Sequence, residues 1–250
     1  MKNLKIKLSI IFLSASSLLS AQILDLYPKK YVNLNFSKER IKEYNSPAAF
    51  LKCSELEKKI SLEGRSLDNL TITEEEIFAN CNETTDFWET VGVGCNWYCG
   101  MSPKKIEGSS FLMSQGGNTY EAKNAHDFSY KTAWAEGVYG YGIGEYLIYT
   151  FDTKNPRINI IKVVNGYVKN LDAWKNNSRV KQLKMYVNNE LFAFLNLKDE
   201  YSEQHFYIPA IGGTWKYDWT IKFEIMQVYK GSKYDDVVIT EIYFDGLDVH

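Results

Sequence analysis

The stretch RVKQLKMYVNNELFAFLNL, residues 179–197, decides the fold class. Polar and apolar side chains alternate through 179–188 around Leu183, Met185 and Val187, a pattern typical of a half-buried strand. Asn188 and Asn189 follow, and asparagine accepts the backbone conformation that a tight hairpin turn needs. A second strand is therefore expected over 191–197, paired antiparallel with the first.

The rest of the C-terminal region repeats this pattern. Short strand-like segments alternate with turns of Gly, Asn and Asp, and no helical pattern separates them. Strands are expected at 145–152, 157–164, 205–208, 219–228 and 237–245. Such a series predicts a mostly β protein whose residues 101–250 form an antiparallel jelly-roll β-sandwich.

The N-terminus is typical of an export signal. Three lysines precede a mostly apolar run, and Ser20-Ala21 offers a small-residue cleavage site, so residues 1–21 are a predicted signal peptide. The run is too short for a comfortable transmembrane helix, which needs roughly 20 apolar residues. The predicted product is exported, either periplasmic or secreted. A formal net charge of −2 gives no reason to expect a nucleic-acid partner.

Residues 22–100 are expected to form a small helical region. Pro47 at a first helical position and Gly64 at a helix end bound one helix, with Phe50, Cys53, Leu56 and Ile60 along one face. The run TEEE at 73–76 is a capping-box pattern that predicts a second, shorter helix.

Four cysteines lie in this region: Cys53, Cys81, Cys95 and Cys99. Four cysteines allow three pairings, and Cys53–Cys81 with Cys95–Cys99 is favoured because each bond closes a local loop. Zinc binding is the alternative, but no C-x-x-C pair is present and an exported protein meets an oxidising compartment.

Residues 124–137, NAHDFSYKTAWAEG, combine an acid, a histidine, a threonine and a tryptophan in one loop. The longer stretch QGGNTYEAKNAHDFSYKTAWAEG (115–137) resembles the first strand and loop of discoidin-like, coagulation-factor type C domains of the galactose-binding-like fold. GYGIGEYLIYTF (140–151) is similar to the next strand of that family. IIKVVNGY (160–167) and KYDDVVITEIYF (233–244) resemble the type C-like domain in the translocation region of bacterial NAD glycohydrolases.

This resemblance covers residues 106–246 and implies binding, often of glycans, without NAD cleavage. In the family a structural calcium ion often ties the loop to the last strand, which makes Asp127, Thr132 and Glu241 candidate ligands for Ca²⁺. The alternative is that Asp127 and Thr132 only form turn hydrogen bonds. Trp134 is expected to pack in the core or at its rim rather than to contact ligand.

No catalytic arrangement is evident, so the protein is predicted not to be an enzyme. The sequence has three histidines, no G-x-S-x-G elbow and no H-E-x-x-H motif. A carbohydrate-active hydrolase stays open as an alternative, because glycoside cleavage needs two carboxylates and the loops supply several. The acids considered are Glu136, Glu145, Asp235 and Asp236.

Aromatic and polar side chains concentrate in the loops between strands. Sugars bind through aromatic faces and fixed polar groups, so these loops predict a glycan or glycoprotein surface as partner. The predicted ligand-binding residues are Tyr139, Tyr141, Tyr167, Trp174, Lys175, Asn176, Arg179, Tyr234, Asp235 and Asp236. Trp174 is expected to be exposed, whereas for Tyr167 packing against the sandwich end is the alternative. A periplasmic protein-interaction or assembly module is a further alternative for the whole protein.

Overall fold

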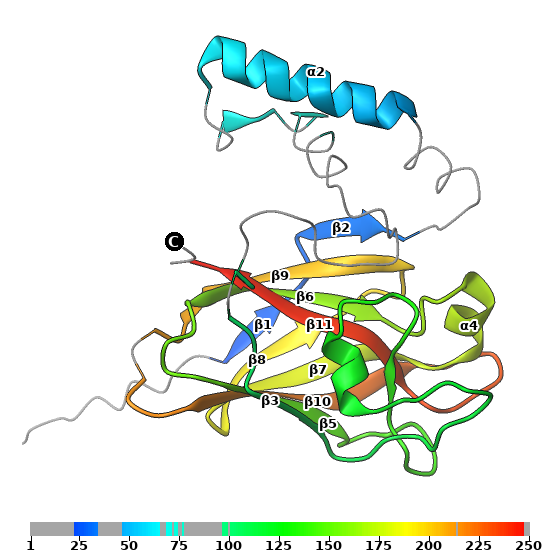
Figure 1. Ribbon diagram of the computed structural model, residues 1–250. Helices are drawn as coiled ribbons and strands as arrows, with labels where there is room; N and C mark the ends of the chain where they lie inside the picture. The colour runs from blue at the N-terminus through cyan, green and yellow to red at the C-terminus, as the bar shows by residue number, and fades with distance from the viewer. Residues whose placement is uncertain are drawn as a thin grey trace, which may run out of the picture.

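The computed structural model describes residues 23–34, 47–65, 69–71, 73–74, 77, 97–99, 101–213 and 215–247. Two β-sheets pack face to face, with strand order β1-β8-β7-β10-β5-β3 in one sheet and β2-β9-β6-β11-β4 in the other. Figure 1 shows the two layers, with helix α2 (Pro47–Glu63) lying beyond the five-stranded sheet. This arrangement confirms the predicted mostly β sandwich.

The predicted strands are present with small changes at their ends. They are β5 (Tyr146–Phe151), β6 (Ile158–Asn165), β7 (Arg179–Val187), β8 (Glu190–Asn196), β9 (Ser202–Ile211), β10 (Trp219–Tyr229) and β11 (Val238–Gly246). Asn188 and Asn189 have φ values of 49° and 68° and join β7 to β8. Both positive values match the tight hairpin turn that the Asn-Asn pair predicts.

Four short strands were not predicted. They are β1 (Leu24–Leu26), β2 (Lys30–Asn33), β3 (Lys105–Gly108) and β4 (Trp134–Ala135). β1 pairs in parallel with β8, and β2 pairs antiparallel with β9, so one N-terminal segment adds an edge strand to each sheet. The sandwich is therefore not confined to residues 101–250, because residues 23–34 belong to it.

Aromatic side chains fill the space between the sheets. Trp134, Trp219, Tyr149 and Phe223 are among the fully buried residues of this core. Trp134 donates its indole N–H to the Ser110 carbonyl at 2.8 Å, which satisfies the polar group that burial would leave unpaired. The prediction that Trp134 packs in the core is confirmed.

The segment before residue 101 also reaches this core. Trp97 has no exposed surface and packs edge-on against Phe151 and Phe244, and its indole N–H bonds the Pro156 carbonyl at 3.1 Å. The predicted boundary at residue 100 therefore falls inside the structural unit, since a tryptophan three residues earlier is part of its centre.

Helix α2 begins at Pro47 and ends before Gly64, as predicted, and Gly64 has the left-handed φ of 61° that a helix end favours. The capping box lies two residues earlier than expected. Thr71 and Glu74 bond reciprocally, with Glu74 N–H to Thr71 Oγ1 at 3.3 Å and Thr71 N–H to Glu74 Oε2 at 2.9 Å.

Several predictions fall on residues outside the described ranges. Cys81 and Cys95 are among them, so the pairing Cys53–Cys81 and Cys95–Cys99 stays a prediction. Residues 1–21, the predicted signal peptide, also lie outside. In the described part of the chain, no helix is both long and apolar enough to cross a membrane.

Candidate functional site

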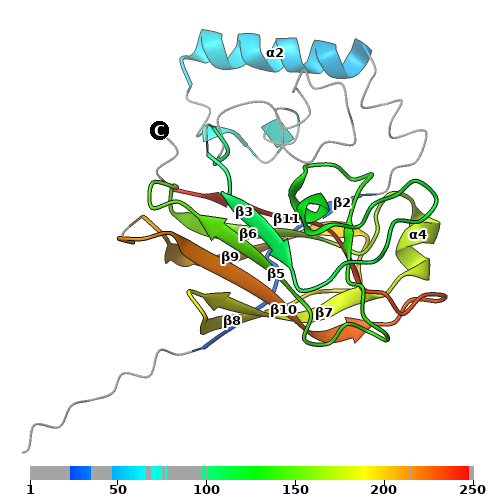
Figure 2. The same cartoon turned by 60° about the horizontal axis from the view of Figure 1, so that its bottom comes forward.

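Three connections between strands gather at one end of the sandwich. They are residues 136–145 between β4 and β5, residues 166–178 between β6 and β7, and residues 230–237 between β10 and β11. Figures 1 and 2 both show them beside α4 (Leu171–Asn176), away from the C-terminal end of β11. We call this group of connections the loop end.

Hydrogen bonds fasten two of these connections together. The Asn176 carbonyl accepts the N–H groups of Lys233 and Tyr234 at 3.1 and 2.8 Å, and the Lys175 carbonyl accepts Ser232 N–H at 2.9 Å. The Ser178 hydroxyl accepts Gly231 N–H at 3.0 Å and donates to the Tyr234 carbonyl at 3.1 Å. The loop carrying Tyr234 is thus ordered by α4, which lowers the entropic cost of binding a ligand there.

Tyrosine rings line the solvent side of the loop end. Tyr139 is fully exposed and Tyr234 is 42% exposed. The ammonium of Lys230 lies 4.8 Å from the centre of the Tyr141 ring, and Lys233 lies equally far from the Tyr234 ring. The structure therefore brings three of the predicted ligand-binding tyrosines to the loop end. Tyr139 and Tyr141 lie in the 136–145 connection, and Tyr234 lies in the 230–237 connection.

Two further polar groups lie next to Tyr234. Partial burial raises the pKa of Tyr120, and the nearby Asp236 carboxylate raises it further. Partial burial also raises the pKa of Asp236, with the like charge of Asp235 adding to the effect. Asp235 itself is exposed. Tyr120 was not predicted, and its position in a glycine-rich turn far from Tyr234 in the sequence gave no signal for it.

Glu136 holds the loop end from beneath. Its side chain is fully buried and accepts the N–H groups of Val138 at 2.9 Å and Val237 at 3.1 Å. Glu145 accepts the Ser109 hydroxyl at 2.6 Å. Burial raises the pKa of Glu136. Because Glu136 is closed to a substrate, it does not form with Glu145 the exposed carboxylate pair that glycoside cleavage requires.

Trp174 differs from its prediction. It lies on α4 rather than in an open loop, and it is partly buried instead of exposed. Its indole N–H donates to the Asn165 carbonyl at 3.0 Å, the Arg179 guanidinium lies 4.6 Å from its ring centre, and Tyr201 packs edge-on at 5.6 Å. Asn-rich composition suggested a loop, but Asn170 caps the helix through the Ala173 N–H at 2.8 Å.

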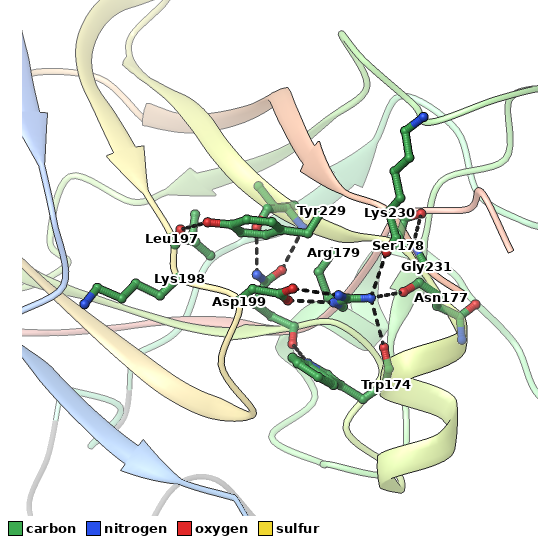
Figure 3. A network of polar contacts seen from close by, with 12 residues as sticks. Trp174, Asn177, Ser178, Arg179, Leu197, Lys198, Asp199, Tyr229, Lys230 and Gly231 are labelled. Atoms are coloured by element: carbon green, nitrogen blue, oxygen red, sulfur yellow. Dashed lines mark hydrogen bonds and ion pairs between the residues drawn. The ribbon is translucent and has the colours of Figure 1, made fainter. Parts of the chain in front are cut away.

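Arg179 is occupied within the protein. Its guanidinium is buried and forms a two-point pair with Asp199 at 2.9 and 2.8 Å, while a third nitrogen donates to the Asn177 carbonyl at 2.8 Å (Figure 3). An arginine whose donors are all directed at such partners holds structure rather than ligand. The structure thus places Arg179 under the loop end and not on its surface.

Tyr167 follows the packing alternative. The ring is buried, its hydroxyl donates to the Lys131 carbonyl at 3.2 Å, and burial raises its pKa to about 12. Lys175 is exposed and Asn176 is partly exposed, but the backbone of Asn176 serves the neighbouring loop. Of the predicted ligand-binding set, Tyr139, Lys175, Tyr234 and Asp235 are exposed, and Tyr141, Trp174, Asn176 and Asp236 are partly exposed.

The predicted calcium ligands meet between η2 (Ala122–His126) and β11. The Thr132 hydroxyl lies 2.8 and 2.7 Å from the two Asp127 oxygens, and Ser129 N–H bonds both Asp127 and Glu241, at 3.1 and 2.9 Å. Phe128 between them has the left-handed φ of 62°, which turns the backbone into this group. Distant parts of the sequence therefore supply the three predicted side chains to one point.

Glu241 gives a physical test of whether an ion fits. The side chain is fully buried, and its Oε2 atom has no hydrogen-bond partner. Burial raises the pKa of Glu241 well above its usual value, and the charge of Asp127 raises it further. Two close carboxylates with one unsatisfied oxygen suit a divalent cation, and calcium accepts hydroxyl and backbone oxygens as its other ligands. No group of three His, Cys, Asp or Glu side chains suited to a metal occurs among the described residues.

Residues 97–245 match the family model described as the NAD glycohydrolase translocation F5/8 type C domain. The chain belongs to this family. The match confirms the resemblance seen in the sequence, and it starts at Trp97, where the structure also places the beginning of the aromatic core.

Solved structures similar to this type C protein are more distant. The CBM32-1 and CBM32-2 domains of Clostridium perfringens ZmpB in complex with GalNAc match at 12% identity and TM-score 0.43, over 58% of this chain and 33% of that one. The same domains without the named sugar match at 13% and 0.41, over 83% and 56%. Arabinofuranosyltransferase AftD from Mycobacteria matches at 16% and 0.41, over 68% and 12%.

The chain spans a third of the first of these structures and just over half of the second. No curated protein sequence matches the chain.

Proposed function

We propose that this type C protein is an exported, non-catalytic binding protein whose sandwich recognises a glycan through the loop end. The observation that carries the proposal is the group of accessible tyrosine rings, Tyr139, Tyr141 and Tyr234, on loops held by α4 and Glu136. Aromatic faces pack against the C–H surfaces of sugar rings, and nearby polar groups can bond sugar hydroxyls.

Charged groups beside these rings support the same function. Lys230 and Lys233 lie against Tyr141 and Tyr234, and the carboxylates of Asp235 and Asp236 follow directly in the chain. Lysines donate and carboxylates accept hydrogen bonds, so the loop end can address sugar hydroxyls in both senses. Membership of the type C family favours a binding role over an enzymatic one.

The test is a glycan array probed with the purified chain, followed by titration of any sugar that binds saturably. Tyr139→Ala and Tyr234→Ala should each weaken binding about tenfold, about 1.4 kcal/mol. Tyr217→Ala is the matched control. Tyr217 is an exposed tyrosine too, at 73%, but it lies in the β9–β10 connection outside the loop end. Array signal that all three variants retain equally would exclude the loop end as the glycan site.

A second candidate function is protein recognition, favoured by apolar side chains next to Tyr139. Phe111, Val138 and Ile143 are 56%, 40% and 58% exposed, and a Cβ placed on Gly137 would meet the Phe111 carbonyl at 2.2 Å, so these loops adjoin. Exposed apolar groups of this kind mark interaction surfaces. A specific protein that co-purifies with the chain, and is lost in Phe111→Ser, would favour this candidate when the array is negative.

We also propose that Asp127, Thr132 and Glu241 hold a calcium ion. The unsatisfied Glu241 oxygen supports this assignment. The ion would neutralise two adjacent carboxylates and tie the loop after η2 to β11, a structural role that leaves ligand contact to the tyrosines. Export of the mature chain, beginning after residue 21, rests on the signal-like N-terminus.

A further inference from the structure

A hollow lies on the flank of the six-stranded sheet, apart from the loop-end tyrosines. Its volume is about 470 Å³, within the size range of small-molecule sites. Strands β7, β8 and β10, the β8–β9 connection and the β1–β2 turn all contribute to its walls. The residues that matter for its chemistry are Tyr27, Lys181, Asn196, Lys198, Gln227 and Tyr229.

Hydrogen bonds hold several residues in the walls of this hollow. The Tyr229 hydroxyl donates to the Leu197 carbonyl at 3.1 Å. The fully buried amide of Gln204 bonds both the N–H and the carbonyl of Lys198, at 2.9 and 2.8 Å. Asp199 is fixed by the two-point pair with Arg179, as Figure 3 shows beside the Tyr229 ring. A site held in place before binding loses less entropy when a ligand arrives.

Positive charge is available in the hollow. Arg179 neutralises Asp199, whereas Lys181 and Lys198 form no ion pair with any residue that the structure describes. The Lys181 ammonium lies 5.9 Å from the ring of Tyr229, which lines the hollow, and the Lys198 ammonium lies 5.6 Å from the ring of Tyr31, which does not line it. Glu200 is the remaining acid of the wall, so the two lysines outweigh it and an anion is favoured.

Amide groups complete the recognition surface. Gln182 donates to the Asn196 oxygen at 2.7 Å, and Gln227 donates to the Gln182 oxygen at 3.4 Å, which forms a connected row of amides across β8, β7 and β10. The Asn196 amide donates to the Asp25 carboxylate and to the Leu26 carbonyl, so its donors are occupied. The exposed Gln227 amide is the group that can offer a donor and an acceptor to sugar hydroxyls. The hollow therefore combines aromatic rings, one exposed amide and two lysines that form no ion pair with a described residue.

We propose that this hollow binds an anionic sugar unit, a pyranose ring that carries a carboxylate. The ring lies against Tyr229 and Tyr27, its hydroxyls bond Gln227, and Lys181 and Lys198 receive the carboxylate. A neutral sugar would leave both ammonium groups without an anionic partner, and a simple anion would leave the faces of the two tyrosine rings and the Gln227 amide without a sugar contact. The residues of the hollow therefore favour a ligand that has both a sugar ring and a carboxylate.

The experiment is a titration of the full mature chain with methyl β-D-glucuronide, followed by calorimetry or by amide chemical shifts. Methyl β-D-glucoside and sodium acetate are the matched probes. The glucoside has the sugar ring without the carboxylate, and acetate has the carboxylate without the ring. The glucuronide should bind at least tenfold more tightly than either probe. Equal affinity for glucuronide and glucoside, or for glucuronide and acetate, overturns the proposal, as does absence of glucuronide binding.

Variants localise the effect. Lys181→Gln and Lys198→Gln should each weaken glucuronide binding about fivefold and leave glucoside binding unchanged, and both sites are exposed, so folding is preserved. Tyr27→Leu, at a 59% exposed position, should weaken both sugars. Lys154→Gln is an exposed lysine control that should change nothing. Unchanged glucuronide affinity in both wall-lysine variants contradicts the assignment.

The outcome is independent of the proposed loop-end function. Tyr139→Ala should leave glucuronide affinity intact, because Tyr139 takes no part in the walls of this hollow. A negative glycan array together with wall-dependent glucuronide binding would reject the loop end only. Glucuronide binding that is lost in Tyr139→Ala but kept in the wall variants would reject the hollow only.

Discussion

At the scale of the residue, His126 is held neutral in the aromatic core. Its Nδ1 atom lies 2.8 Å from the Ile242 carbonyl, its ring packs near Tyr98, Tyr149 and Phe244, and burial lowers its pKa to about 4. The folded state therefore binds fewer protons than the unfolded state between pH 6.5 and 4. The contribution of neutral His126 to the free energy of unfolding is therefore complete above pH 6.5. It falls by on the order of 3 kcal/mol as the pH falls toward 4.

Urea unfolding between pH 7 and pH 4, together with an NMR titration of the imidazole, checks this prediction. The Cε1 proton of His126 should titrate near pH 4, while the model-peptide value is about 6.5. A normal imidazole titration in the folded chain would contradict the prediction and would place water next to the ring.

Trp174→Ala should destabilise the chain rather than abolish a ligand contact. The substitution removes the ring that packs on Arg179 and Tyr201, and it leaves the Asn165 carbonyl without its indole donor. The expected loss is about 3 kcal/mol in urea unfolding, the lower end for a large aromatic truncation. Trp215→Ala, at a 42% exposed site, should cost less than about 0.5 kcal/mol. Equal urea midpoints for the two variants would mean that Trp174 contributes no more to stability than an exposed tryptophan does.

These residues show what the sequence could and could not indicate. The capacity of Trp174 and Arg179 to bind ligand was inferred from composition, but their partners, Asn165 and Asp199, lie nine and twenty residues away. Charge and aromaticity are visible in a sequence, whereas the carbonyl or carboxylate that consumes them is set by packing. Asp127 and Glu241 were brought together correctly only because family resemblance supplied the long-range pairing.

At the scale of the element, α4 and the 230–237 connection behave as one unit through Ser178. The hydroxyl is fully buried and serves both Gly231 N–H and the Tyr234 carbonyl. Ser178→Ala leaves a donor and an acceptor unsatisfied and should cost about 1–3 kcal/mol. Amide exchange at 230–236 should quicken, and binding at Tyr234 should weaken with it. Ser232→Ala, which removes a single exposed bond to Asn176, is the control; an equal effect of both would rule out a central role for Ser178.

The join between the η2 loop and β11 predicts a linked response to calcium and pH. Burial and Asp127 raise the folded pKa of Glu241, so the folded state binds more protons than the unfolded state above pH 4.5. In chelator, this group should therefore lower stability as the pH rises from 4.5 toward the folded pKa. Calcium should restore the melting temperature at neutral pH, because it binds the native state alone.

Glu241→Gln separates this effect from the others. The variant should lose the fall in stability with rising pH in chelator, and it should lose the response to calcium as well. Thermal melts of both proteins at pH 5 and pH 8, with and without calcium, give the comparison. If the wild-type melting temperature changes with neither chelator nor pH, Asp127 and Thr132 form only the hydrogen bonds of a turn and hold no ion.

Strand prediction succeeded where the alternation was long and local. The β7–β8 hairpin follows from two alternating runs and two asparagines, and both asparagines have positive φ. It failed for β1 and β2, because strands of three and four residues are too short to show a clear alternation of polar and apolar side chains. Their partners lie more than 160 residues ahead, in parallel register for β1, and no local pattern can specify such a pairing.

At the scale of the whole molecule, residues 23–34 join the two sheets. β1 covers the edge of β8 and β2 covers the edge of β9, while Leu24 and Leu26 pack on the core and Leu34 is 2% exposed. A strand edge without a partner presents unpaired N–H and carbonyl groups that pair readily with another chain. This segment thus contributes apolar burial and also prevents edge-to-edge association.

A chain that begins at residue 35 should reveal both contributions when compared with one that begins at residue 23. The shorter chain loses the burial of three leucines, each worth about 1.5–3 kcal/mol when fully buried, and exposes β8 and the ten-residue strand β9 as edges. Its urea midpoint should fall, and light scattering should detect concentration-dependent association that the longer chain lacks. Both chains keep all four cysteines and the complete family match, so neither disulfides nor the type C core differ between them. Matching midpoints and two monomeric proteins would mean that β1 and β2 only decorate the sandwich, and that β8 and β9 are stable as edges without them.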